Sequence, residues 1–194
     1  ETAAQALRQY PETAGAWLCI SQILAAQHAP DDSGLGALRN AYTRDTLATA
    51  VMRRLASKYE ARRDTANLLD MLKRILTIDF RDNELRIRAA RLMVQMGVSD
   101  SAVRLVNQGL EQNPASVELL GVKAIAMAAG SHWDSAFAAL QSVADIDTSK
   151  VDSLLVFRIT NYARQIPDTT RWLQWVERAT QRLPAQPDYW YTLA

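Results

Sequence analysis

The chain has 194 residues, of which 48% are hydrophobic, and its 22 Lys and Arg residues nearly balance 21 Asp and Glu residues, giving a formal net charge of +1. This composition excludes an intrinsically disordered chain, and no uninterrupted apolar run is long enough to span a membrane. The single cysteine, Cys19, excludes an intrachain disulfide and a Cys-rich zinc motif.

Helical periodicity runs along the whole chain, and no segment shows the two-residue alternation that is typical of a strand. The shortage of glycine (7 residues) and proline (6 residues) also favours helix. The sequence therefore predicts an all-α fold. The predicted helices span, in chain order, residues 13–28, 33–43, 46–62, 64–79, 83–96, 99–113, 116–129, 132–147, 150–165, 168–183 and 188 onward.

The breaks between the helices carry residues with strong backbone preferences. We expect a loop at Pro30–Gly34, because proline and glycine interrupt a helix there. Gly97 and Gly130 follow apolar runs and are predicted as left-handed helix ends. The segment Ser131–Asp134 resembles a capping box. The predicted N-cap residues of the helices that follow these breaks are Ser99, Ser131 and Asp168.

Short loops make consecutive helices antiparallel, and the resulting pairs repeat along the chain. Equivalent places early in the first helix of each pair, spaced 34 to 36 residues apart, hold Trp17, Met52, Arg86, Leu120, Val156 and Trp190. The ends of the second helices are marked by Pro11, Phe80, Pro114 and Pro184, with Thr148 where a proline is missing. A period near 34 residues with two helices per unit indicates a helical solenoid. The predicted units are residues 1–11 (partial), 13–46, 47–80, 83–114, 116–148, 150–184 and 187–194 (partial).

The residues at these places resemble the tetratricopeptide repeat. Trp17–Ser21 and Trp190–Ala194 match the opening of that repeat, in which a large residue is followed by Leu or Ile and then a small residue. Arg86 stands where the repeat has a core residue, with Leu85 as the alternative after a one-residue slip. The resemblance covers the whole chain and implies a right-handed α-solenoid of about five antiparallel helix pairs with partial repeats at both ends. The expected small residues, which let paired helices approach closely, are Ser21, Ala56, Ala90 and Ala124.

No set of residues in the sequence points to catalysis, so we predict that the chain is not an enzyme and holds no cofactor or metal. Cys19 lies in an apolar stretch and is expected to be a buried core thiol. The two histidines, His28 and His132, lack partners at the spacing of metal ligands, and no glycine-rich phosphate loop is present. Four aromatic residues are interpreted as core fillers in preference to a cage for a cation: Trp133, Phe157, Trp172 and Trp175.

Basic residues concentrate in the middle of the chain. Residues 53–91 contain eleven Lys and Arg residues against six Asp and Glu residues, a net charge of +5. A zone of this kind attracts an acidic peptide or a phosphate backbone. The alternative is a solvated helix face that is laced with ion pairs.

The tetratricopeptide resemblance implies that the first helices of successive units line a concave groove. Arginine pairs bidentately with carboxylates, so arginines in this groove are expected to anchor an acidic partner. The family's clamp for a peptide's terminal carboxylate needs Lys and Asn where this chain has Arg53 and Ser57, so the resemblance does not imply that clamp. The predicted partner-binding residues are Gln22, Arg53, Ser57, Arg88, Arg91, Ile125, Phe157, Asn161 and Arg164.

The resemblance thus implies a non-catalytic scaffold that binds a segment of a partner protein, acidic in character, in its groove. An RNA-binding helical-repeat module and an architectural spacer within a larger protein stay open as alternatives, and self-association through the repeat ends is a further expectation. The chain begins without Met and shows no secretory signal, so we expect it to be a piece of a longer polypeptide.

Overall fold

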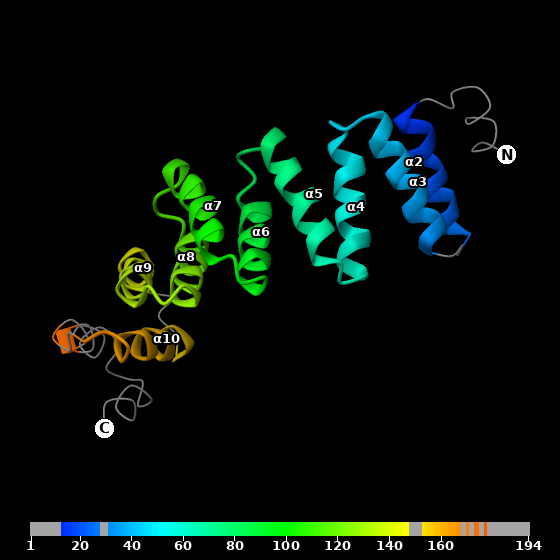
Figure 1. Cartoon of the computed structure of the whole chain (residues 1–194). Coiled ribbons are helices and arrows are strands. Elements are labelled where there is room, and N and C mark those ends of the chain that lie inside the picture. The colour runs from blue at the N-terminus through cyan, green and yellow to red at the C-terminus, as the bar shows by residue number, and fades with distance from the viewer. Residues whose placement is uncertain are drawn as a thin grey trace. The chain divides into compact units, whose positions relative to one another are not determined.

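The computed structural model describes residues 13–27, 31–147, 153–167, 170, 173, 174 and 177, and the regular structure in this part of the chain is all helical (Figure 1). The all-α prediction is therefore confirmed. The chain divides into two compact units, which we call unit 1 (residues 1–85) and unit 2 (residues 86–194). Of the predicted helix at 168–183, residues 170, 173, 174 and 177 are described, and they are helical. The predicted helix from 188 onward, the N-cap Asp168 and the repeat ends Pro11, Thr148 and Pro184 lie outside the described residues.

The ends of the described helices agree with the predicted ones to within three residues. In chain order they are α2 (Ala14–Ala26), α3 (Asp31–Arg44), α4 (Thr49–Ala61), α5 (Thr65–Ile78), α6 (Asn83–Gln95), α7 (Ser99–Gln112), α8 (Val117–Ala129), α9 (Trp133–Ile146) and α10 (Ser153–Ala163). The predicted loop at Pro30–Gly34 is wrong for residues 31–34, because they form the first turn of α3. Acidic residues suit a helix N-terminus, and the buried Gly34 is tolerated there.

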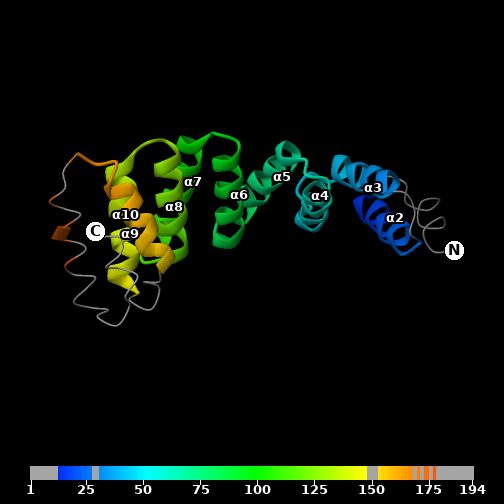
Figure 2. The ribbon, with the colours of Figure 1, turned by 90° about the horizontal axis from the view of Figure 1, so that it is seen from below.

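Unit 1 is built from helices that pack on their neighbours along the chain: α2 on α3, α3 on α4 and α4 on α5 (Figure 2). Helix α5 begins where Asp64 accepts hydrogen bonds from the backbone N–H and the side-chain amide of Asn67, at 3.2 Å and 2.7 Å. The buried face of α5 has the three- and four-residue spacing of an amphipathic helix. It consists of Leu68, Leu69, Met71, Leu72, Ile75 and Leu76.

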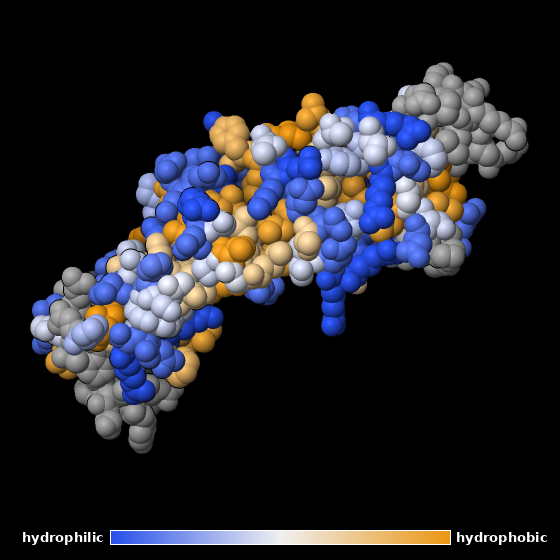
Figure 3. Space-filling view, in the orientation of Figure 1, coloured by the Kyte–Doolittle hydropathy of each residue, from blue (hydrophilic) through white to orange (hydrophobic). Residues whose placement is uncertain are grey.

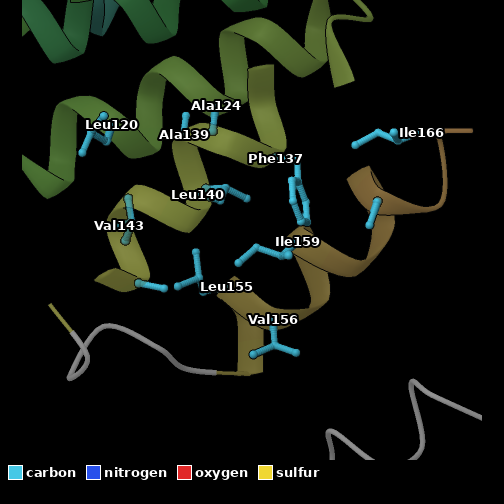
Figure 4. Packing of buried hydrophobic residues seen from close by; sticks show 12 residues of the cluster. Leu120, Ala124, Phe137, Ala139, Leu140, Val143, Leu155, Val156, Ile159 and Ile166 are labelled. Atoms are coloured by element: carbon cyan, nitrogen blue, oxygen red, sulfur yellow. The ribbon is translucent and has the colours of Figure 1, made fainter. Parts of the chain in front are cut away.

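Unit 2 holds a continuous apolar core that α8, α9 and α10 share (Figure 4). Phe137 of α9 and Ile159 of α10 are fully buried in it, and Ala124 of α8 belongs to the same core. Trp133 lies at the margin of this core, with its ring 5.8 Å from that of Tyr162. Trp133 is therefore partly buried against the core, as the core-filler interpretation predicts. That interpretation is wrong for Phe157, which is 56% exposed, and Trp172 and Trp175 lie outside the described residues. Burial of a side chain as large as Phe137 contributes about 1.5–3 kcal/mol.

Most of the described positions that define the repeat pattern are buried as predicted, but Trp17 is only partly buried, and Trp190 lies outside the described residues. The large residues Met52, Arg86, Leu120 and Val156 are all buried. Arg86 and its alternative Leu85 are both buried, so burial does not distinguish between the two registers. The small residues that were expected to allow close helix approach are buried too, namely Ser21, Ala56, Ala90 and Ala124.

Three turns between the helices of a pair share one backbone geometry. In each, the second residue after the first helix is left-handed, and these residues stand 34 positions apart: Arg63 (φ 57°), Gly97 (φ 76°) and Ser131 (φ 61°). In each turn the following N–H donates to a carbonyl five residues back, as from Val98 to Met93 at 2.9 Å. The left-handed end at Gly97 is thus confirmed.

Several predictions about the caps are wrong for the same reason. Gly130 has a φ of −88°, because the turn places its left-handed residue at Ser131. Ser131 consequently cannot be the N-cap; that position falls to His132, which makes no side-chain cap bond, so the predicted capping box is absent. Ser99 is the first residue of α7, and the N-cap is Val98.

Candidate functional site

The first helices of the pairs leave one face open to solvent. On α2 the exposed residues include Cys19 and Gln22, while Ala16 and Ser21 are buried on other sides of the helix. The prediction of a buried Cys19 is therefore wrong. Its apolar neighbours in sequence point to different sides of the helix, because successive residues are turned by about 100°.

Helix α4 repeats this arrangement one unit later. The predicted groove residues Arg53 and Ser57 are exposed, whereas Met52 and Ala56, each one position earlier, are buried. The exposed face of α4 thus begins directly beside the residues that hold the helix in the core.

Arg53 already has acidic partners within unit 1. Its guanidinium lies 3.1 Å from a carboxylate oxygen of Asp82 and 3.7 Å from one of Asp79. Partial burial raises the pKa of Asp82, but the backbone N–H of Leu85 and the Arg53 guanidinium lower that pKa by more, so it lies below its ordinary value. An acidic partner must therefore compete with two carboxylates for Arg53.

The exposed face of α6 carries two arginines, Arg88 and Arg91, and one carboxylate, Glu84, four residues before Arg88. Arg88 and Arg91 are both exposed and lie three residues apart, so they share one side of the helix. Within the described ranges, no carboxylate pairs with Arg91. Of the predicted anchors Arg53, Arg88 and Arg91, Arg91 is thus the most available to a partner's carboxylate.

The corresponding faces of α8 and α10 carry less charge. On α8, Gly121 and Ile125 are half-buried. On α10, Phe157 is 56% exposed and Asn161 is half-buried, and Arg164, in the turn directly after α10, is exposed. The sequence analysis missed Leu154, which is 53% exposed one turn before Phe157. The three-residue spacing of these two large apolar residues is the sequence signal from which Leu154 could have been found.

Three arginines of the central basic zone, which has eleven basic residues, pair with carboxylates within the chain. Besides Arg53, Arg62 pairs with Asp32 at 2.6 Å and Arg74 pairs with Asp70 at 2.8 Å. The space-filling view shows hydrophilic side chains spread over the visible face of each unit, with apolar side chains between them (Figure 3). These contacts favour the interpretation of the zone as a face laced with ion pairs over that of a continuous phosphate-binding surface.

A separate open pocket of about 470 Å³ lies in unit 2, beside the turns that precede α7 and α9. Asp100, Arg104 and His132 line it, but the opposite charges offset one another and Arg104 donates a hydrogen bond to the Ser101 hydroxyl at 3.0 Å. In the part of the chain that the structure describes, no cluster of His, Cys, Asp or Glu is arranged to hold a metal ion. None of the helices described is both long and apolar enough to cross a membrane.

No family model and no curated protein matches this chain, but solved structures do. YrrB, a TPR protein with an unusual peptide-binding site, is 14% identical with a TM-score of 0.67, over 98% of this chain and 97% of that one. A tetratricopeptide repeat protein from Parabacteroides merdae is 16% identical with a TM-score of 0.59, over 98% and 74%. A chain of Naa15/Naa10 bound to HypK-THB is 17% identical with a TM-score of 0.66, over 96% of this chain and 28% of that one. The chain therefore has the all-α solenoid fold of tetratricopeptide-repeat proteins.

Proposed function

We propose that the chain is a non-catalytic scaffold that binds a segment of a partner protein on the exposed faces of its first helices. The observation that carries this proposal is the pair of exposed arginines on α6, Arg88 and Arg91. They lie on the same helix as the buried Arg86, Ala89 and Ala90, so packing fixes the helix that presents them. A preformed surface of this kind binds a partner with little loss of its own conformational entropy.

The groove residues support this function to different degrees. Arg88 and Arg91 each offer a planar fork that matches a carboxylate, and hydrogen bonds to charged groups contribute about 1.5–3 kcal/mol each. Arg53 contributes less to binding an acidic segment, because Asp79 and Asp82 compete for it. Ser57 and Gln22 supply neutral hydrogen-bonding groups on the faces of α4 and α2.

The solved structures that share the fold of this chain also support the proposal. YrrB is described as having a peptide-binding site, and the Naa15/Naa10 structure is described as bound to HypK-THB. Both share the fold of this chain at low sequence identity. A scaffold of this fold therefore has the kind of surface that holds a peptide.

A random peptide library displayed on phage is the probe that tests the proposal with the full chain. Peptides that it selects are titrated against the wild type and against the double variant Arg88→Glu/Arg91→Glu by calorimetry. The matched control is Lys73→Glu/Arg104→Glu, which places the same charge change on exposed residues of the second helices α5 and α7.

We expect selected peptides to be rich in Asp and Glu and to bind the first-helix variant at least about tenfold more weakly, with the control unchanged. Equal weakening in both double variants would contradict the proposal. Retention of polyuridylate RNA with a steep salt dependence, in place of peptide binding, would favour the RNA-binding alternative.

A further inference from the structure

A pocket in unit 2 lies outside the predicted partner-binding residues. It lies beside the turns that precede α7 and α9 (Figure 1), and its volume is about 470 Å³. Pockets that bind small molecules have volumes of about 300–1,000 Å³. The lining residues come from both turns, from the end of α8 and from the first part of α7: Gly97, Val98, Ser99, Asp100, Ser101, Arg104, Ala129, Gly130 and His132. This pocket therefore has the size of a small-molecule site.

The two charged side chains of α7 in this pocket do not pair with each other. Asp100 and Arg104 lie four residues apart, so they share one side of the helix, where side chains of opposite charge commonly form an ion pair. In the part of the chain that the structure describes, Asp100 has no cationic partner, and Arg104 donates a hydrogen bond to the Ser101 hydroxyl at 3.0 Å. The pocket therefore presents one cation and one anion, each able to bind a ligand.

The start of α7 places further donors near Arg104. The N-cap residue Val98 makes no side-chain bond to the helix, and the first N–H groups of a helix have no acceptor within it. Ser99 and Ser101, which carry hydroxyl groups, line the same part of the pocket. A carboxylate that pairs with Arg104 can therefore accept additional hydrogen bonds from the start of this helix.

His132 reaches the pocket from the turn between α8 and α9. A Cβ atom built at Gly130 would lie 3.1 Å from Cδ2 of the His132 imidazole, closer than side chains normally approach. Gly130 has a φ of −88°, which any residue adopts, so what distinguishes glycine here is the room that it leaves to the imidazole. The imidazole makes no cap bond to α9, so its ring nitrogens can hydrogen-bond a polar ligand.

We infer that this pocket binds a free α-amino acid with a polar side chain. Arg104 pairs with the α-carboxylate, Asp100 accepts hydrogen bonds from the α-ammonium group, and His132 hydrogen-bonds the polar end of the side chain. Cβ atoms four residues apart on a helix are about 5–6 Å apart, which suits a ligand whose two charges are attached to one carbon. The inference does not rest on the proposed function, because no residue of the pocket belongs to the predicted partner-binding set.

The two opposite charges favour an amino acid over a simple ion. Arg104 attracts an anion such as phosphate, but Asp100 repels it, and the reverse holds for a cation. A zwitterion satisfies both side chains at once and adds no net charge to the pocket. Among the described residues, moreover, no cluster of His, Cys, Asp or Glu is arranged to hold a metal ion.

L-Glutamine is the probe that tests the inference, titrated into the isotope-labelled full chain while amide chemical shifts are followed by NMR. Glutaramate lacks the α-ammonium group of glutamine, γ-aminobutyramide lacks its α-carboxylate, and inorganic phosphate serves as the simple anion. We expect glutamine to shift the amides of residues 97–104 and 130–132. We expect each comparison molecule to bind about threefold to fivefold more weakly than glutamine, as for the loss of one exposed ion pair.

Three variants assign the groups of the ligand to their residues. Asp100→Asn is expected to weaken glutamine about threefold to fivefold but not glutaramate, and Arg104→Gln to weaken glutamine but not γ-aminobutyramide. Gly130→Ala displaces the imidazole of His132, so it is expected to weaken glutamine but not L-alanine, whose side chain is apolar. The matched control is Gly36→Ala on α3, where the added Cβ meets nothing within 4 Å and glutamine binding is expected to stay unchanged. Circular dichroism confirms that each variant remains helical.

The outcomes decide between an amino-acid site, an anion site and no site. Phosphate or glutaramate binding as tightly as glutamine, with no loss of glutamine affinity in Asp100→Asn, identifies a simple anion site and overturns the inference. Shift changes by glutamine that lie outside the pocket, or none at all, also overturn it. Weakening of glutamine to the same extent by Gly130→Ala and Gly36→Ala would mean that the imidazole takes no part, and would contradict the assigned ligand.

Discussion

The shared turn geometry predicts opposite effects for two simple substitutions. Gly97→Ala places a side chain on a residue with a φ of 76°, and the added Cβ meets nothing within 4 Å, so its cost comes from the backbone alone. Ser131 has the same left-handed conformation, with a φ of 61°, and its side chain is exposed. Ser131→Gly removes the energetic cost of that conformation, because glycine adopts it without strain. The left-handed conformation costs a non-glycine residue about 1–2 kcal/mol.

The greater chain entropy of glycine in the unfolded state offsets about 0.5–1 kcal/mol of that difference. We therefore expect Gly97→Ala to lower the free energy of unfolding by about 0.5–1 kcal/mol and Ser131→Gly to raise it by a similar amount. Each kcal/mol shifts Tm by about 2–4 °C in a chain of this size.

Urea and thermal unfolding, followed by circular dichroism, measure both effects. Gly121→Ala on α8 is the control, because it makes the same chemical change inside a helix and is expected to stabilise by about 1 kcal/mol. A Gly97→Ala variant as stable as the wild type, or a Ser131→Gly variant less stable than the wild type, would refute the reasoning from backbone conformation.

Three further predictions concern the core and its pH dependence. Phe137→Ala, at a side chain that is 1% exposed, is expected to destabilise by about 3–5 kcal/mol in urea unfolding, and a loss below about 1 kcal/mol would contradict its central place. Ala90→Trp, at a fully buried small position, is expected to lower the free energy of unfolding by about 1–3 kcal/mol, whereas an unchanged Tm would argue against close helix approach there. The pKa of Asp82 is lower in the folded chain than its ordinary value, so its carboxylate stabilises the fold above about pH 4 and this contribution disappears as the pH falls through the folded pKa. Asp82→Asn should therefore lose less Tm than the wild type between about pH 7 and pH 3, and an equal loss in both proteins would contradict this role.

The sequence predicts the helix pairs well because their apolar residues repeat at a fixed spacing. Met52 and Val156 are recognisable as core residues from that spacing alone, and even Arg86 is buried where the pattern places it. The turns are predicted less well, because the repeat geometry fixes which residue becomes left-handed whatever its type. Ser131 therefore takes the conformation that the sequence suggests for Gly130.

The sequence predicts which residues of the candidate site are exposed to solvent. It does not predict which of them form ion pairs with other side chains. The helical register places Arg53, Arg88 and Arg91 on open faces, as the structure has them. The contact between Arg53 and Asp82 joins residues 29 positions apart, so it depends on the packing of separate helices and has no local signal. The exposure of Cys19 likewise depends on which side of α2 packs against α3, which neighbouring residue types do not reveal.

The assignment of partner binding to the first helices is tested most directly by mapping the bound peptide on the chain itself. Amide chemical shifts of the isotope-labelled chain are followed by NMR during titration with a peptide selected from the phage library. We predict shift changes on the exposed faces of α6, α8 and α10, including Arg91, Gly121 and Phe157. Changes confined to the second helices α7 and α9 would contradict the account.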